Sequence, residues 1–160
     1  MEERFSLLIV SDSHGNVPSL ISVVEQEPSI DLLLHAGDGE KDCDMLTGWY
    51  EKPLLRVAGN CDRTSEAPRL HLFHQSGKTI LLCHGDQFRV KQGLQELHRY
   101  AKENHIDLVI YGHTHHPSCI EQDGITYINP GALAPHAALK TYAIVTLDRS
   151  SITTTFNSVF

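Results

Sequence analysis

Residues of the types that bind divalent metal ions follow five short apolar runs of this chain. The runs begin at residues 7, 32, 54, 80 and 108 and consist mostly of leucine, isoleucine and valine. The residues that follow them are Asp12, His14, Asp38, Asn60, His84, His113 and His115. If the runs end at one edge of a sheet, two carboxylates, one amide and four imidazoles converge there. This set is too large for one ion that leaves room for a substrate, so it predicts a pair of ions.

The donor types predict which ions bind and what chemistry they support. The set contains oxygen and nitrogen donors and no thiolate, which favours manganese, nickel, iron, magnesium, cobalt or zinc. Asp38 lies between Gly37 and Gly39, where the backbone can approach an ion closely. Its carboxylate has two oxygens, so it can bridge two ions. Two ions about 3.5–4 Å apart form the hydrolytic arrangement of phosphatases and nucleases, in which bound water loses a proton near neutral pH.

The apolar runs also predict the elements that hold these residues. Runs of this length and composition are typical of strands buried on both faces. In open α/β sheets the functional groups collect beyond the carboxyl ends of such strands. Asn16 can cap a helix that has Pro18 in its first turn, and an apolar stripe predicts a second helix within 90–104. We expect strands at about 7–10, 31–36, 54–58, 78–83 and 107–111.

Two hairpins are expected in the C-terminal part of the chain. Asp123-Gly124 separates two short apolar runs, and residues 148–151 separate another such pair. The N-terminal part therefore predicts βαβ units and the C-terminal part predicts antiparallel strands. Because the chain has 160 residues, we expect one domain over 1–160, a central β-sandwich flanked by helices.

Charge and cysteine content exclude several classes of partner and site. The formal net charge is −7 and no run of lysine or arginine appears, which disfavours binding to nucleic acid and to membrane surfaces. No apolar run approaches the roughly 20 residues of a membrane span. The four cysteines are scattered without CxxC spacing, so neither a zinc–thiolate site nor a disulfide framework is expected. A cytoplasmic protein with reduced thiols is the simplest interpretation.

Five sequence blocks resemble those of the calcineurin-like metallophosphoesterases. The blocks occur in the family's order: Asp12-Ser13-His14-Gly15, Gly37-Asp38, Gly59-Asn60, His84-Gly85 and Gly112-His113-Thr114-His115. The short chain and Asn129-Pro130-Gly131 are similar to the small phosphodiesterase branch, which resembles a retromer scaffold subunit in fold. The resemblance extends from about residue 5 to residue 147. It implies a single-domain α/β fold, a four-layered α/β/β/α sandwich.

The resemblance also implies how the ligands divide between two ions. The first ion would be held by Asp12, His14, Asp38 and His115. The second ion would be held by Asp38, Asn60, His84 and His113. A hydroxide bridging the ions would attack phosphorus in line, and the ions would stabilise the charge that builds in the transition state. The implied function is a metal-dependent phosphoesterase, and specifically a phosphodiesterase, with manganese as the first choice of metal and a small phosphate ester as substrate.

Two other functions remain as alternatives. One is a non-catalytic protein-interaction scaffold of the same fold, and the intact ligand set argues against it. The other is a phosphomonoesterase for small metabolites. Small relatives often form dimers, so a homodimer is a further expectation that follows only from the resemblance.

One block departs from the family pattern. Many relatives have a histidine after the Gly-Asn pair that acts on the leaving group or binds phosphate, whereas this chain has Cys61. General acid catalysis contributes roughly 10²–10⁴-fold, so its loss favours substrates with good leaving groups. Asp62 and Arg63 follow, and Arg63 could reach a phosphate oxygen. Together with Asp38 and Asn60, these two are the expected catalytic residues.

Other histidines and aromatic residues are interpreted as supporting groups. His35, three residues before Asp38, is expected to support the loop rather than bind metal. His116 either lines the pocket or is exposed. Trp49 and Tyr50 are expected in the core, with a lid over the substrate as the alternative. The remaining histidines have no informative spacing and are interpreted as structural: His71, His74, His98, His105 and His136.

Overall fold

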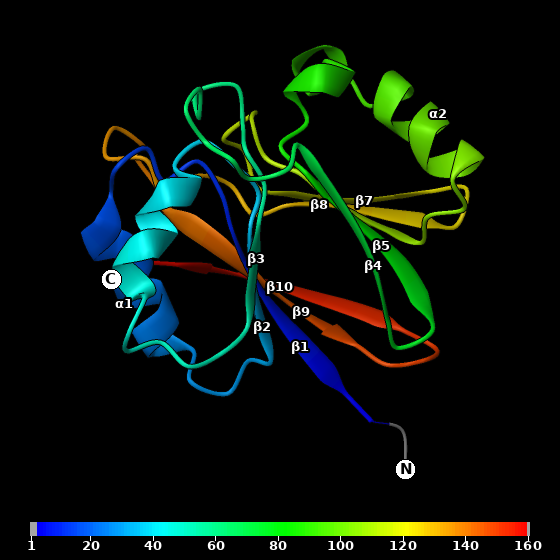
Figure 1. The fold of residues 1–160 in the computed structure, drawn as a ribbon. Coiled ribbons are helices and arrows are strands. Elements are labelled where there is room, and N and C mark those ends of the chain that lie inside the picture. The colour runs from blue at the N-terminus through cyan, green and yellow to red at the C-terminus, as the bar shows by residue number, and fades with distance from the viewer. Residues whose placement is uncertain (1–2, 160) are drawn as a thin grey trace.

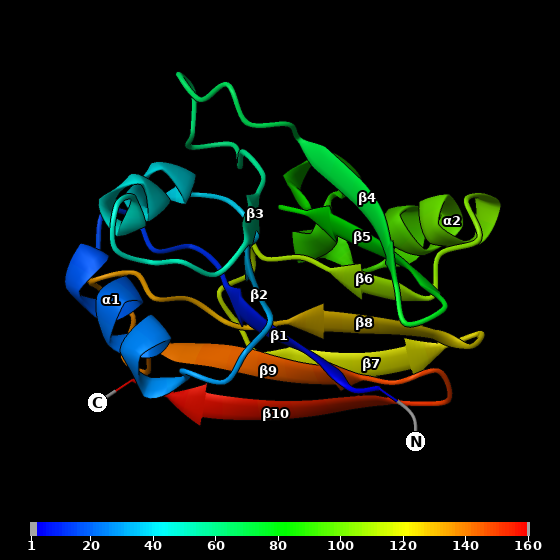
Figure 2. The ribbon, with the colours of Figure 1, turned by 60° about the horizontal axis from the view of Figure 1, so that its bottom comes forward.

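The computed structural model describes residues 3–159, which form four layers (Figure 1). Two five-stranded sheets lie at the centre and enclose an apolar core between them. Helix α1 covers the outer face of one sheet and helix α2 covers the outer face of the other (Figure 2). The expected α/β/β/α sandwich is therefore confirmed.

The first sheet contains the strands of the N-terminal βαβ units. Its strand order is β10-β9-β1-β2-β3. The bounds are β1 Phe5–Val10, β2 Leu32–His35, β3 Leu54–Arg56, β9 Thr141–Leu147 and β10 Ile152–Ser158. Strands β1, β2 and β3 are parallel, whereas β9 pairs with both of its neighbours in antiparallel fashion. The carboxyl ends of β1, β2 and β3 therefore meet at one edge.

The second sheet has the order β4-β5-β6-β8-β7. Its strands are β4 Leu70–Gln75, β5 Lys78–Cys83, β6 Leu108–Ile110, β7 Ser118–Gln122 and β8 Ile125–Asn129. The predicted β7–β8 and β9–β10 hairpins are confirmed. The expected antiparallel pairing is present within both hairpins, but β8 also pairs in parallel with β6, beside which the β7–β8 hairpin places it. Strands β4 and β5 form a further hairpin in the N-terminal part.

The burial of β1 explains why its apolar run has no polar member. Successive side chains of a strand point to opposite faces of the sheet. Leu7 and Ile9 lie in the core between the sheets, while Leu8 and Val10 lie in the core beneath α1. Both faces of this strand are therefore covered.

Helix α1 spans Val17–Gln26 and begins as the sequence predicted. The Asn16 side chain accepts a hydrogen bond from the backbone N–H of Ser19 at 3.3 Å, and Pro18 lies in the first turn. The side chain of Leu20, a residue of this helix, is buried in the core between α1 and the first sheet. The cap fixes the point at which the chain leaves the loop that follows β1.

The second helix is shorter than the predicted range 90–104. Helix α2 spans Gln95–Glu103, and Val90–Gln92 forms a separate 3₁₀ turn that follows another at Asp86–Phe88. Gly93 has φ 121° and ψ 174°, a conformation that interrupts the helix and is open to glycine. The apolar stripe still packs beneath α2, in the core on the outer face of the second sheet.

The segment after Asp38 is a 3₁₀ helix, Glu40–Leu46, followed by a loop. Tyr50 packs against the core beneath α1, as expected. The expectation for Trp49 was wrong: this side chain is 49% exposed and donates its Nε1–H to the carbonyl of Met45 at 2.9 Å. Among residues 3–159, no helix has the length and apolar character needed to cross a membrane.

Candidate metal centre

The loops that follow β1, β2, β5 and β6 bring six of the seven predicted ligands together. Asp12, His14 and His115 have ligand atoms within 4.8 Å of one another. Asp38, His84 and His113 form a second group with the same spacing. The two groups correspond to the two ion positions that the family resemblance implies, although the sequence places their members up to 103 residues apart (12 and 115).

The two groups adjoin, because two histidines each face both carboxylates. His84 Nε2 lies 3.2 Å from Asp38 Oδ2 and 3.8 Å from Asp12 Oδ1. His14 Nε2 lies 3.8 Å from Asp38 Oδ2 and 3.7 Å from Asp12 Oδ1. His115 Nε2 lies 3.2 Å from Asp12 Oδ1. The six side chains therefore form one continuous cluster.

Two atoms of this cluster are buried without a hydrogen-bond partner. They are Asp12 Oδ1 and His14 Nε2, and the Asp12 side chain is fully buried. A buried acceptor without a partner costs about 1–3 kcal/mol, and more when it is charged. A divalent cation between these atoms would satisfy both of them. The donor set, carboxylate oxygens and imidazole nitrogens, fits such an ion.

The backbone of the cluster is strained. A positive φ is uncommon in residues other than glycine, costs on the order of 1–3 kcal/mol, and concentrates at functional sites. Backbone hydrogen bonds between the loops after β1 and β2 maintain this conformation: Asp12 N donates to Gly37 O at 2.9 Å, and His14 N donates to Asp38 O at 3.1 Å. Five cluster residues have positive φ: Asp12 (51°), His14 (43°), Asp38 (59°), His113 (70°) and His115 (66°).

Two glycines of the sequence blocks leave room for the carboxylates. A Cβ atom on Gly59 would lie 2.2 Å from Asp38 Oδ1. A Cβ atom on Gly112 would lie 2.6 Å from Asp12 Oδ2 and 2.0 Å from the hydroxyl of Ser11. Any side chain at these positions would displace a ligand, which explains the glycine before Asn60 and the glycine before His113.

Both carboxylates are ionised. Burial raises the pKa of Asp12, but the imidazoles of His115 and His14, which face its Oδ1, outweigh burial and hold the pKa well below its usual range. Asp12 Oδ2 also accepts from the Ser11 hydroxyl at 2.6 Å and from His113 N at 3.0 Å. Burial likewise raises the pKa of Asp38, yet His84 and the backbone N–H of Cys61 lower it to about 2.

His84 is oriented so that one nitrogen faces the carboxylates. Its Nδ1 lies 2.8 Å from the carbonyl of Ala36, which can only accept, so Nδ1 carries the proton and Nε2 is free to bind an ion in the neutral ring. His113 Nδ1 lies 3.2 Å from this Nε2. Burial lowers the pKa of His84, but Asp38 and Asp12 outweigh burial and raise it, so the position favours positive charge.

His35 supports the loop, as predicted. Its Nδ1 accepts from the backbone N–H of Gly37 at 3.1 Å, so Nε2 carries the proton and donates to the Ser13 hydroxyl at 2.8 Å. Ser13 donates in turn to Asp42 at 2.6 Å. Burial lowers the pKa of His35 to about 4, so the ring is neutral. The ring of His35 therefore connects the loop that carries Asp38 with the loop that carries His14.

Asp62 and Arg63 lie in different surroundings. The Asp62 carboxylate accepts three backbone N–H bonds, from Asp38 at 2.7 Å, Gly39 at 2.8 Å and Gly59 at 2.9 Å. It thereby joins the loops after β2 and β3. Arg63 is exposed. The sequence contains no signal for the three-fold acceptor role of Asp62 beyond its position after the Gly-Asn block.

Asn60 and Cys61 lie at the rim of the cluster, and both are exposed. Asn60 Nδ2 lies 3.7 Å from Cys61 Sγ. The backbone N–H of Cys61 donates to Asp38 Oδ1 at 2.8 Å, and its sulfur forms a third close group with His14 and Asp38. Burial and the Asp38 carboxylate raise the pKa of the Cys61 thiol, so it remains protonated.

His136 lies beside the cluster, although its spacing in the sequence offers no signal for this. Its ring centroid is 6.2 Å from that of His14 and 5.8 Å from that of His115. His116, for which the sequence left two interpretations, is exposed. Asn129 donates to Gly112 O at 3.0 Å and to Thr114 Oγ1 at 2.9 Å, so it anchors the loop that carries His113 and His115.

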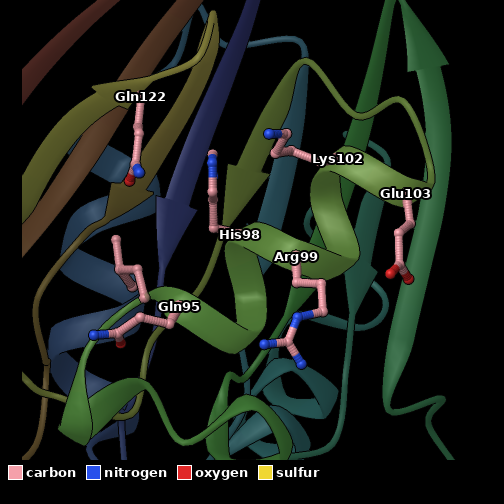
Figure 3. Close-up of a pocket in the computed structure, with 7 residues that line it drawn as sticks. Gln95, His98, Arg99, Lys102, Glu103 and Gln122 are labelled. Atoms are coloured by element: carbon pink, nitrogen blue, oxygen red, sulfur yellow. The ribbon is translucent and has the colours of Figure 1, made fainter.

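One surface hollow lies away from this cluster. It has a volume of about 630 Å³ and is formed by α2 and the end of β7 (Figure 3). It shares no lining residue with the cluster. The hollow and the cluster are therefore separate features of the molecule.

Comparison with known proteins agrees with this geometry. Residues 5–150 match the model of the calcineurin-like phosphoesterase superfamily domain. The chain belongs to this family. It is 31% identical over 154 residues to a protein of Bacillus subtilis (strain 168) named "Probable metallophosphoesterase YsnB", covering 94% of this chain and 89% of that protein.

Solved structures show the same fold. A predicted phosphoesterase from Streptococcus pneumoniae TIGR4 superposes with a TM-score of 0.82 at 25% identity, covering 99% of this chain and 94% of that one. A structure described as a novel archaeal phosphodiesterase gives a TM-score of 0.74 at 19% identity, covering 96% and 100%. Vps29 proteins share the fold as well, which agrees with the resemblance to a retromer scaffold subunit.

Proposed function

We propose that this protein is a metal-dependent phosphodiesterase that hydrolyses small phosphate esters with two divalent ions, manganese being the first choice. The observation that carries the proposal is the fully buried Asp12 carboxylate, whose Oδ1 lacks a hydrogen-bond partner and faces three imidazoles. Charged acceptors are buried in this way when a cation completes them. Membership of the calcineurin-like phosphoesterase family supports hydrolysis of a phosphate ester as the reaction.

Each ion would have its own ligands around a shared carboxylate. The first would be held by Asp12, His14, Asp38 and His115. The second would be held by Asp38, Asn60, His84 and His113. When bound, the two ions would supply Lewis-acid chemistry that lowers the pKa of water for in-line attack and neutralises charge on the phosphoryl group.

The chain's own residues would keep this ligand set in place before a substrate arrives. The Ala36 carbonyl fixes the ring of His84, and Asn129 holds the loop of His113 and His115. Asp62 would act as a positioning residue, because its carboxylate binds the backbone N–H of Asp38 itself. The exposed Arg63 would be available to a phosphate oxygen.

The surroundings of Cys61 favour diesters with good leaving groups. A thiol whose pKa is raised by burial and by Asp38 donates a proton poorly. Proton donation matters most for leaving groups that are strong bases. The fold shared with an archaeal phosphodiesterase is consistent with this preference.

Hydrolysis of an activated aryl phosphodiester with added manganese tests the proposal. We expect turnover that a chelator abolishes, and loss of turnover and of metal in Asp38→Ala, which removes the shared carboxylate. Glu25→Ala, at an exposed acidic residue of α1, is the matched control and should behave as the wild type. Absence of metal-dependent turnover with manganese, nickel, iron, magnesium, cobalt and zinc would reject the proposal.

Two further measurements separate the alternatives. Comparing rates on an aryl monoester and the corresponding diester distinguishes a phosphodiesterase from a monoesterase. Metal analysis after loading with manganese distinguishes an enzyme from a scaffold, because less than one ion per chain would favour a scaffold. Analytical ultracentrifugation would test the expected homodimer.

A further inference from the structure

We propose that His136 binds the phosphoryl group of the substrate beside the first ion position. It would supply, from the loop between β8 and β9, the imidazole that many relatives carry at the place of Cys61. This inference rests on the proposed function, since it assumes that a phosphate ester is the molecule that enters the cluster. From the sequence alone, His136 is interpreted as a structural residue.

The position of His136 relative to the ligands carries the inference. Its ring is tilted at 51° to that of His14 and at 37° to that of His115, with centroids 6.2 Å and 5.8 Å away. The rings of His14 and His115 are themselves 5.4 Å apart. The three imidazoles therefore form a triangle in which two belong to the predicted ligand set and the third does not.

Long-range contacts hold the loop that carries His136. The backbone N–H of Leu133 donates to the carbonyl of Ser11 at 3.2 Å, and the side chain of Asn16 donates to the carbonyl of Leu133 at 2.7 Å. Ser11 and Asn16 flank His14 on the loop after β1. Leu133 is fully buried in the core beneath α1. These contacts therefore anchor the chain, three residues before His136, against the loop that carries His14.

A tight turn presents the ring at the end of this anchored segment. The backbone N–H of Ala137 donates to the carbonyl of Ala134 at 3.0 Å, which closes a four-residue turn with Pro135 and His136 at its centre. Proline presets the backbone angle for the second position of such a turn. His136 lies next to it and is exposed, so its side chain is available to a molecule that arrives from solvent.

The ligand geometry favours substrate over metal as the partner of His136. The close group at the first ion position comprises Asp12, His14 and His115 and does not extend to His136. An imidazole carries at least one ring N–H in its neutral and its cationic form, so it can donate to a phosphate oxygen in either form. Such a charge-assisted hydrogen bond orients the phosphoryl group against the ions.

Orthophosphate binding to the manganese-loaded chain, measured by isothermal titration calorimetry, tests the inference without turnover. His136→Ala should weaken orthophosphate binding about tenfold, the loss expected for one hydrogen bond to a charged group, while manganese content stays unchanged. His136→Asn retains an N–H donor and should recover most of the affinity. His74→Ala, at an exposed histidine of β4, is the control and should bind orthophosphate as the wild type does.

Kinetics on the aryl phosphodiester provide a second readout. His136→Ala should raise KM in step with the weaker orthophosphate binding. Unchanged orthophosphate affinity in His136→Ala would overturn the inference, and so would loss of manganese, which would make His136 a metal ligand. A wild-type chain that binds manganese but no orthophosphate would also overturn it. A wild-type chain that binds both but hydrolyses nothing would reject the proposed hydrolase alone, because the orthophosphate titration still decides on His136.

Discussion

Two clusters of histidine and aspartate in this molecule have opposite hydrogen-bonding states. Beneath α2, His98 Nε2 lies 2.7 Å from Asp123 Oδ2, and its Nδ1 contacts the hydroxyl of the buried Tyr127 (Figure 3 shows His98). Both ring nitrogens of His98 therefore have partners. In the metal centre, Asp12 Oδ1 and His14 Nε2 are buried without one. The same residue types are therefore hydrogen-bonded in the first cluster and include unpartnered buried atoms in the second.

The two clusters also differ in their backbone conformation. His98 lies within the regular helix α2, whereas five residues of the metal centre have positive φ. Strain of this kind persists only where surrounding contacts impose it, and it concentrates at functional sites. Histidine–carboxylate pairing occurs in both clusters, whereas unpartnered buried atoms on strained loops distinguish the candidate metal centre.

The largest effect is expected when the buried charge of the metal centre is removed. Asp12→Asn should decrease kcat/KM on an aryl phosphodiester by on the order of 10²–10³-fold, because it removes preorganised charge from the first ion position. Manganese content, measured by mass spectrometry, should decrease with it. Asp123→Asn removes the carboxylate of the other cluster and should leave both quantities unchanged. Equal losses of kcat/KM and manganese content in the two variants would show that the clusters do not differ in function.

His35 lies next to the metal centre, and both of its ring nitrogens are hydrogen-bonded. Its titration should make the free energy of unfolding depend on pH. Its pKa is near 6.5 in the unfolded chain and about 4 in the folded protein. As pH falls, the unfolded state therefore binds the proton first. The contribution to stability is fully present above pH 6.5 and is lost as pH falls from 6.5 to 4, a decrease of about 3 kcal/mol.

Urea unfolding at pH 7.5 and at pH 4 measures this decrease in metal-free protein. His35→Asn preserves a donor and an acceptor but does not titrate, so its stability should depend less steeply on pH. His105→Asn, at an exposed histidine, is the control and should keep the wild-type slope. If His35→Asn kept that slope too, the assignment of a buried neutral imidazole to His35 would be wrong.

Manganese itself should distinguish the clusters by thermal unfolding. A ligand at about 100 times its Kd stabilises the folded state by about 2.7 kcal/mol, which corresponds to a rise in Tm of roughly 5–10 °C for a chain of this size. A chelator should reverse the rise. His98→Ala should lower Tm but keep the same manganese-dependent rise. Loss of that rise in His98→Ala would indicate that manganese binds at the His98–Asp123 cluster and not at the metal centre.

The smallest effect is expected inside the satisfied cluster. Tyr127→Phe removes one hydrogen bond to His98 and should lower the free energy of unfolding by about 1 kcal/mol. Urea denaturation measures this loss, and kcat/KM should stay within the error of the wild type. A tenfold decrease in kcat/KM would instead show that the two clusters are coupled through the second sheet.

Much of the fold followed from local patterns. Strands such as β1 have both faces covered, so an uninterrupted apolar run was sufficient to predict them. The predicted helix within 90–104 was too long because its apolar stripe continues across Gly93, where the chain turns. The parallel pairing of β8 with β6 was missed, because a hairpin signal specifies the partner of β7 and leaves the other edge of β8 open.

The candidate site divides in a similar way. His35 could be recognised as a loop support from its distance to Asp38 in the sequence. The role of Asp62 could not, because its three N–H donors come from loops that the fold brings together. His136 was missed for the same reason: the hydrogen bonds that position its loop reach back to Ser11 and Asn16.

The amino-acid sequence by itself determined which donor atoms the protein possesses and that each follows an apolar run, because apolar runs and glycine-containing turns are local properties of the chain. Only the tertiary structure decided which of those atoms lack a partner and which imidazole from a distant loop lies beside them. Distances between loops depend on how strands pair and sheets stack, and those long-range contacts leave no local trace in the order of residues.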